Sequence, residues 1–199
     1  MSSRETPPAG RPAAAPRKRA GLRIAVVGVG VAVVAAVALL SATSSGEKAP
    51  AAYVTDPGKF EIPALEGDGW VKLADFKGRP LVVNFFASWC GPCEKELPDF
   101  ARAAEALEGK VAFIAVNSQE LSPGAGLALA RRMRLEESGI TLAKDVGGRA
   151  GSLLHDALGR GMPINAFYDA DGRLLDVSRG ALLENRLREE LQRLYGVTF

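Results

Sequence analysis

The sequence predicts an α/β fold in which one central mixed β-sheet is flanked by helices and preceded by a single N-terminal transmembrane helix. Three observations predict it. Short apolar runs alternate with amphipathic stretches, a hairpin pattern follows them, and residues 24–40 form an uncharged apolar run. The composition, with 47% hydrophobic and 24% charged residues, is usual for a globular protein, so one ordinary domain with extra segments is expected.

The basic residues are concentrated at the N-terminus. Residues 1–40 carry six Lys or Arg and one acid, whereas residues 41–199 carry 19 basic and 22 acidic residues. Residues 1–23 are rich in Pro and Ala and lack hydrophobic periodicity, which predicts a disordered cytoplasmic arm. Because the remainder is slightly acidic, the charge distribution argues against a nucleic-acid-binding protein.

Residues 24–40 are long enough for a short membrane span, and the basic residues before them place the N-terminus in the cytoplasm. The rest of the chain would then be extracytoplasmic on a single-pass cell-membrane protein. A cleaved signal peptide is the alternative, which would release a secreted or periplasmic domain. We favour the anchor, because the small residues that follow match the cleavage pattern poorly. Residues 41–59 are predicted to form a linker, and residues 60–199 the folded domain.

The first half of the domain alternates strands and helices. Residues 70–73 predict a short strand, residues 81–86 a buried strand, and residues 93–107 a helix with a kink at Pro98. Residues 111–117 predict a second buried strand and residues 123–137 a second helix. Two buried strands joined by a helix imply parallel pairing with a right-handed connection. Four aromatic residues are expected in the core, namely Trp70, Phe85, Phe86 and Phe113.

The second half begins with a weak, glycine-rich segment and a short helical stretch at residues 152–158. Residues 164–178 then predict a β-hairpin, because Asp-Gly turn chemistry at residues 169–172 separates two strand patterns. A terminal helix follows. Its predicted apolar face consists of Leu183, Leu187, Leu191 and Leu194.

The chain has only two cysteines, Cys90 and Cys93. A purely structural disulfide between them would close almost no loop, so it would stabilise the fold very little. A zinc site needs about four ligands, whereas the chain offers two thiols and a single histidine, His155. A redox-active pair is the remaining interpretation, and no metal or other cofactor is expected.

The position of the pair suits that chemistry. It follows a buried strand and opens a helix, where unpaired N–H groups favour a thiolate on Cys90. Cys90 is therefore predicted to be the exposed nucleophile that forms a mixed disulfide, and Cys93 to resolve it. Gly91 and Pro92 leave no bulky side chain over the sulfurs, and Trp89 is predicted to shape the substrate-binding surface.

The motif F-x-x-W-C-G-P-C, the helical Pro98 and the sequence Gly-Met-Pro before a strand resemble the thioredoxin superfamily over residues 60–196. The resemblance implies a thioredoxin-like fold. It also implies a cis peptide bond between Met162 and Pro163, packed against the cysteine pair, where the backbone of Met162 binds a substrate strand.

The sequence differs from cytosolic thioredoxins at the groups that handle protons. Asn84 and Ala115 stand where those proteins have a buried Asp and its Lys partner. Glu96 lies three residues after Cys93, on the same helix face. This pattern resembles the membrane-anchored exported branch of TlpA, ResA and the cytochrome-c-maturation thioredoxins. That resemblance implies a catalytic role for Glu96, because apolar packing around its carboxyl could raise its pKa. The alternative is that Glu96 is an ordinary solvated charge on the helix.

We therefore expect a membrane-tethered, extracytoplasmic thiol–disulfide oxidoreductase. Gly-Pro between the cysteines resembles reducing thioredoxins. By resemblance, its substrates would be exported proteins with disulfides, such as apocytochrome c, and a membrane thiol-electron transporter would supply electrons. A disulfide-forming oxidant and a copper-binding, chaperone-like module remain alternatives. His155 is expected to be a surface histidine rather than a catalytic one.

Overall fold

The computed structural model describes residues 54–147 and 153–199. The chain divides into two units, residues 1–49 and 50–199, and the described residues all belong to the second. Within them, no helix is both long and apolar enough to cross a membrane. The transmembrane helix predicted at residues 24–40 lies outside the described residues, as does the predicted cytoplasmic arm.

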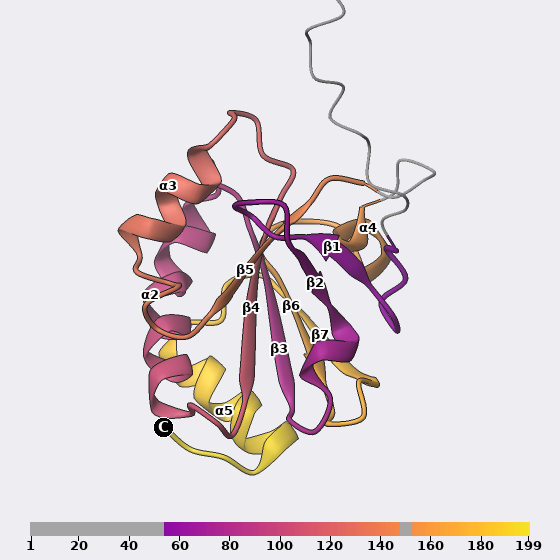
Figure 1. The fold of residues 1–199 in the computed structure, drawn as a ribbon. Coiled ribbons are helices and arrows are strands. Elements are labelled where there is room, and N and C mark those ends of the chain that lie inside the picture. The colour runs from indigo at the N-terminus through magenta and orange to yellow at the C-terminus, as the bar shows by residue number, and fades with distance from the viewer. Residues whose placement is uncertain (1–53, 148–152) are drawn as a thin grey trace, which may run out of the picture. The chain divides into compact units, whose positions relative to one another are not determined.

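A five-stranded mixed sheet forms the centre of the domain, in the order β5-β4-β3-β6-β7 (Figure 1). β3 pairs in parallel with β4, and β4 with β5, whereas β6 is antiparallel to both β3 and β7. The predicted parallel crossover and hairpin are thus confirmed. The strands are β3 (Leu81–Phe86), β4 (Ala112–Ser118), β5 (Thr141–Asp145), β6 (Ile164–Tyr168) and β7 (Leu174–Arg179).

The remaining elements cover the two faces of this sheet (Figure 1). One face carries the helices α2 (Gly91–Ala106), α3 (Ala125–Arg132) and α5 (Glu184–Tyr195). The other carries α4 (Leu154–Leu158) and a small antiparallel sheet of β1 (Glu61–Pro63) and β2 (Trp70–Lys72), which the 3-10 helix η1 (Leu73–Phe76) follows.

The side chains of β3 alternate between two apolar cores. Val82 and Phe86 pack with α2, α3 and α5, whereas Val83 and Phe85 pack with β1, β2 and α4. Every residue of the strand is buried, which explains its continuous apolar run. The polar exception is Asn84, which lies in the middle of the strand and leads to the site described below.

Three predictions of detail were wrong. Trp70 is 36% exposed, because β2 belongs to the outer two-stranded sheet. The predicted helix at residues 123–137 is shorter: α3 begins after Gly124, which is left-handed, and ends at Arg132. Leu183 is half-exposed because it precedes α5 rather than lying on its buried face, whereas Leu187 and Leu191 are buried.

β5, which pairs with β4 at the edge of the sheet, was not among the predicted strands. Its segment follows a left-handed Gly139, and the strand is only partly buried. It therefore lacks the continuous apolar run of β3 and β4. The strand matters for the site, because its last residue, Asp145, holds the short helix α4.

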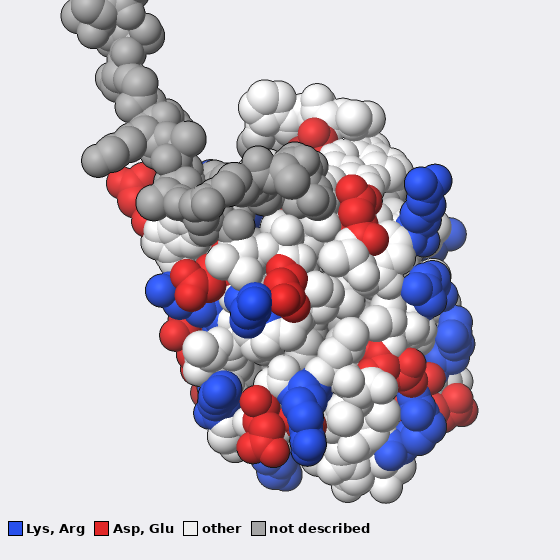
Figure 2. Space-filling view, turned by 90° about the vertical axis from the view of Figure 1, so that its right-hand side faces the viewer, with Lys and Arg blue, Asp and Glu red and all other residues white. Residues whose placement is uncertain are grey.

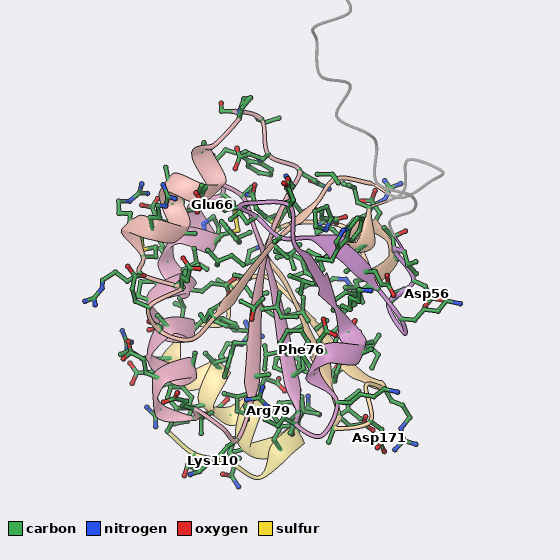
Figure 3. The ribbon with its side chains drawn as sticks, in the orientation of Figure 1. Asp56, Glu66, Phe76, Arg79, Lys110 and Asp171 are labelled. Carbon is green, nitrogen blue, oxygen red and sulfur yellow. A yellow bond between two sulfur atoms is a disulfide. The ribbon has the colours of Figure 1, made fainter. Side chains whose placement is uncertain are left out.

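The topology brings several segments to one edge of the sheet. β3, β4 and β5 are parallel, so their carboxyl ends meet there, and the antiparallel β6 begins at the same edge. The disulfide lies at this end, at the start of α2, whereas Arg79, Lys110 and Asp171 lie at the opposite end (Figure 3). On the face seen in Figure 2, acidic and basic side chains are interspersed without a large patch of either sign.

Candidate active site

Cys90 and Cys93 form a disulfide at the N-terminus of α2, with their Cα atoms 5.3 Å apart. Cys90 is the residue before the first helical turn, and Pro92 lies within that turn. Proline is tolerated there, because the N–H groups of the first turn have no partner within the helix. The backbone N–H of Cys93 donates a hydrogen bond of 3.2 Å to the sulfur of Cys90. The predicted strand–turn–helix setting of the pair is confirmed.

Both sulfur-bearing residues are nearly enclosed. Cys90 is 3% exposed and Cys93 is fully buried, so the prediction of an exposed Cys90 was wrong. Both side chains belong to the apolar core that α2 forms with the sheet. The solvent-exposed surface of the site is instead formed by the neighbours Trp89, Gly91 and Pro92.

Glu96 is fully buried, one helical turn beyond Cys93, so its interpretation as a solvated charge was wrong. Its Oε1 accepts a hydrogen bond from Asn84 Nδ2 at 2.7 Å, and its Oε2 accepts one from the backbone N–H of Leu182, also at 2.7 Å. Burial raises the pKa of Glu96 to about 7, although these hydrogen bonds and one from Asn165 partly oppose the rise. The carboxyl can therefore exchange a proton near neutral pH.

Asn84 links the carboxyl of Glu96 to β6. Its Nδ2 donates both to Glu96 and to Oδ1 of Asn165, its cross-strand neighbour, at 2.7 Å. Among the described residues, the buried Oδ1 of Asn84 has no hydrogen-bond partner. The sequence analysis noted Asn84 but not Asn165, although an amide inside the apolar run of β6 was a usable signal.

The peptide bond between Met162 and Pro163 is cis, as the resemblance implied. Pro163 is buried at the start of β6, and its carbonyl oxygen accepts a hydrogen bond from the N–H of Gly180 at 2.9 Å. Met162 packs against the apolar core that contains the cysteine pair. Its role in binding a substrate strand stays a prediction.

Trp89 is 48% exposed, and its indole N–H donates to the carbonyl oxygen of Gln119 at 2.9 Å. The next residue, Glu120, fixes this turn after β4 to the loop before the disulfide. Its carboxylate accepts hydrogen bonds from the N–H and the hydroxyl of Ser88, at 2.9 and 2.7 Å, and from Asn117 Nδ2 at 3.1 Å. Burial alone would raise the pKa of Glu120, but these bonds lower it to about 2.

Glu120 was not among the predicted site residues, because Ser88 lies 32 residues away along the chain and no local pattern marks the contact. Beside this turn lies a groove of about 610 Å³, whose lining includes Gln119, Leu121 and Val146. Neither cysteine lines the groove.

His155 is fully buried, so its assignment to the surface was wrong. Its ring lies edge-on to Phe85, with the ring centroids 5.8 Å apart. Both ring nitrogens have polar neighbours: Nε2 lies 2.6 Å from the carbonyl oxygen of Gly161, and Nδ1 lies 3.1 Å from Nε2 of Gln119. The sequence did not show this, because a lone histidine on a five-residue helix carries no periodicity.

Asp145 fixes the helix that carries His155. Its carboxylate accepts hydrogen bonds from the backbone N–H groups of Leu154 and His155, at 3.0 and 2.8 Å, and from the hydroxyl of Ser118 at 3.2 Å. Burial raises the pKa of Asp145, with these bonds opposing the rise. Within residues 54–147 and 153–199, no group of three or more His, Cys, Asp or Glu side chains could hold a metal ion.

A comparison with protein families identifies the domain. The family described as Redoxin matches residues 44–191. The chain belongs to the Redoxin family.

Two curated relatives carry the names of thiol–disulfide enzymes. The chain is 28% identical over 150 residues to the thiol-disulfide oxidoreductase ResA of Bacillus thuringiensis subsp. konkukian, covering 75% of this chain and 78% of the relative. It is 30% identical over 136 residues to the thiol:disulfide interchange protein DsbE of Pseudomonas fluorescens biotype C, covering 68% and 71% of the two chains.

Solved structures share the fold of this chain. The pneumococcal exposed lipoprotein thioredoxin Etrx1 of Streptococcus pneumoniae matches with a TM-score of 0.55 and 25% identity, covering 68% of this chain and 99% of that one. A secreted disulfide oxidoreductase of Mycobacterium tuberculosis matches the fold with a TM-score of 0.56, covering 69% and 98%. This Redoxin chain is therefore a thiol–disulfide oxidoreductase with a thioredoxin-like fold and a redox-active Cys90–Cys93 disulfide.

Proposed function

We propose that this enzyme is tethered to the cell membrane through residues 24–40 and reduces disulfides of exported proteins outside the cytoplasm. The observation that carries the redox part of the proposal is the buried carboxyl of Glu96, one helical turn beyond Cys93, with a pKa of about 7. A reductant must move protons as well as electrons at each step, and this group exchanges a proton at the working pH.

The cycle begins from the reduced enzyme. The thiolate of Cys90 attacks one sulfur of the substrate disulfide, so that a mixed disulfide forms and the other substrate sulfur leaves as a thiolate that takes up a proton. The thiol of Cys93 then passes its proton to the carboxylate of Glu96 and attacks the sulfur of Cys90. The second substrate sulfur leaves as a thiolate that takes the proton from Glu96, and the enzyme is left with the Cys90–Cys93 disulfide and the Glu96 carboxylate. Two electrons and two protons from a membrane thiol-electron transporter restore the dithiol.

Two features support the reducing direction. Gly91 and Pro92 between the cysteines are the residues of reducing thioredoxins, whose potential lies at roughly −270 mV. In addition, the negative charge of the Glu96 carboxylate disfavours a thiolate on Cys93, which lies on the same helix face, in the reduced enzyme. A less stable dithiol gives up its electrons more readily.

Substrate recognition in this proposal uses the loop at Met162. Met162 packs against the apolar core that contains the cysteine pair, and in this proposal an extended substrate segment pairs with its backbone. Trp89 supplies the exposed aromatic surface next to that segment. The substrate class we propose is an exported protein with an oxidised cysteine pair, such as apocytochrome c, whose haem-attachment sequence is C-x-x-C-H.

The reduction potential of Cys90–Cys93 in the full chain tests the direction, measured by equilibration with thiol buffers. A value below roughly −250 mV supports the reductant. A value above roughly −180 mV overturns it in favour of the disulfide-forming oxidant, which the N–H of Cys93 would assist by stabilising a Cys90 thiolate.

Two further measurements test the location and the substrate. Membrane fractionation, combined with protease accessibility of the domain in intact cells, is expected to show an extracytoplasmic domain that stays with the membrane. A domain recovered only in the soluble fraction would contradict the tether. For the substrate, we expect the enzyme to turn over an oxidised C-x-x-C-H peptide. Copper titration with a Cys90→Ser control tests the alternative: tight copper binding that is lost in the variant would favour a copper-binding module.

A further inference from the structure

A continuous path of polar contacts joins the loop before the disulfide to the loop with the cis peptide bond. The indole N–H of Trp89 donates to the carbonyl oxygen of Gln119 at 2.9 Å. The side-chain Nε2 of Gln119 lies 3.1 Å from Nδ1 of His155. On the other side of the ring, Nε2 of His155 lies 2.6 Å from the carbonyl oxygen of Gly161, the residue before Met162.

The partners fix where the ring proton lies. A carbonyl oxygen can only accept, so Nε2 of His155 carries the proton and donates it to Gly161. Nδ1 then has a free lone pair, which accepts from the amide of Gln119. The carboxylate of Asp156 lies farther from Nδ1, at 3.5 Å, and its side chain is exposed. The ring is thus satisfied on both sides in its Nε2–H form.

The centre of the path is held firmly. The ring of His155 is fully buried against Phe85, and its backbone N–H donates to Asp145 at 2.8 Å. Such a side chain cannot change its position without leaving buried polar groups unpaired. Gly161, by contrast, is exposed, and the hydrogen bond from His155 joins it to the core in addition to the packing of Met162.

Gln119 adds an independent sign of constraint. Its φ is +54°, in the left-handed region, which costs a non-glycine residue roughly 1 kcal/mol. This conformation turns its backbone carbonyl toward Trp89 while its side chain reaches His155. The five bonds that Glu120 accepts, two of them from Ser88, keep the turn in place.

We propose that His155 and Gln119 are positioning residues: they set the distance between the Met162 loop and the disulfide, and thereby the affinity for polypeptide disulfides. Neither residue touches the reacting sulfurs in this proposal. The inference rests on the proposed role of the Met162 backbone in binding a substrate strand. A small disulfide that makes no strand contacts does not depend on this path.

Steady-state kinetics of the full chain test the proposal with two substrates, an oxidised C-x-x-C-H peptide and the small aromatic disulfide DTNB. His155→Leu removes the contacts to the Gly161 carbonyl and to the Gln119 amide, and we expect its KM for the peptide to rise on the order of tenfold with little change in kcat. His155→Gln is expected to restore most of this loss, because an amide offers one donor and one acceptor. Asp156→Asn is the matched control and should keep the wild-type KM.

The exposed side chain of Gln119 gives a variant with little risk to folding. Gln119→Ala is expected to raise the peptide KM severalfold while its rate with DTNB stays within about twofold of wild type. A peptide KM that stays at the wild-type value in both Gln119→Ala and folded His155→Leu overturns the positioning role. If the wild-type enzyme itself handles the peptide no better than DTNB, strand binding at Met162 is wrong, and the positioning role with it.

The histidine also has a direct spectroscopic signature. His155 is the only histidine in the chain, so ¹⁵N labelling of histidine reports on this ring alone. The Nε2–H tautomer is expected, with an exchange-protected ring proton and a signal that shifts in Gln119→Ala. A ring protonated on Nδ1 instead would contradict the path of hydrogen bonds.

Discussion

The Oε2 atom of Glu96 accepts a hydrogen bond of 2.7 Å from the backbone N–H of Leu182. One turn later on the same helix, Asp99 Oδ2 accepts from the backbone N–H of Glu184 at 2.8 Å. Two carboxyl groups of α2 therefore hold the start of α5. The carboxyl beside the resolving cysteine is thus a part of the tertiary structure as well as of the active site.

The stability of the protein should fall with pH because of Glu96. Its pKa of about 7 in the folded state lies above the ordinary value of 4.5, so between these two values the folded state holds a proton that the unfolded state has lost. This stabilisation is complete below pH 4.5 and is lost as the pH rises through 7. It amounts to about 3 kcal/mol.

Denaturant unfolding of Glu96→Gln across this pH range measures the effect. Glutamine stays neutral, so the free energy of unfolding of the variant relative to wild type should increase from pH 4.5 to above pH 7. Glu94→Gln, exposed on the same helix, is the control and should follow the wild-type curve within about 1 kcal/mol. Parallel curves for Glu96→Gln and wild type would show that the carboxyl ionises normally.

The two cysteines should have unequal roles. Cys93 is fully buried, whereas Cys90 precedes the helix and keeps a small exposed area. Cys93→Ser should therefore accumulate a mixed disulfide between Cys90 and an oxidised peptide, visible by intact-mass spectrometry. Cys90→Ser should accumulate none. Equal trapping by both variants would mean that either sulfur can be attacked.

Glu120 should make the site acid-sensitive. Its pKa is lowered from 4.5 to about 2, so the stabilisation it provides is present above pH 4.5 and is lost as the pH falls through 2. Glu120→Gln should be less stable than wild type at pH 6, and the difference should shrink by pH 2.5. Thermal unfolding at both pH values measures this, with the exposed Glu66→Gln as control. If the stability difference between Glu120→Gln and wild type were the same at both pH values, the lower stability of the variant would come from lost packing rather than lost charge.

The stability of the fold should respond in opposite directions to loss of the hydroxyl from two tyrosines, the buried Tyr168 and the half-buried Tyr195. The hydroxyl of Tyr168 is buried without a hydrogen-bond partner among the described residues, whereas that of Tyr195 donates to the carbonyl oxygen of Leu81 at 2.9 Å. Tyr168→Phe should raise the free energy of unfolding by about 1 kcal/mol, and Tyr195→Phe should lower it by a similar amount. A stability loss in Tyr168→Phe would reveal a partner for its hydroxyl.

The parts of the fold that local sequence determines were predictable. Continuous apolar runs predicted β3 and β4, and the Asp-Gly turn predicted the hairpin of β6 and β7, because each signal lies within the element itself. The cis peptide bond before Pro163 could be expected from resemblance alone. These features need no knowledge of the tertiary structure.

The site was only partly predictable, because its remaining contacts join distant segments. Glu96 lies among charged neighbours, so the sequence could not decide between burial and solvation. The burial of His155 depends on β5, which was missed, and the contact of Glu120 with Ser88 joins loops 32 residues apart. Such residues have no local pattern that distinguishes them from surface polar groups.

The near-complete enclosure of the disulfide has a consequence for selectivity in a mixture of thiols. Only 3% of Cys90 is exposed, so a free small thiol has few productive directions of collision with the sulfur. A protein that docks on the surrounding residues places its own sulfur in the one productive direction throughout its residence time. We therefore expect the disulfide to react faster with proteins that dock around it than with free low-molecular-weight thiols.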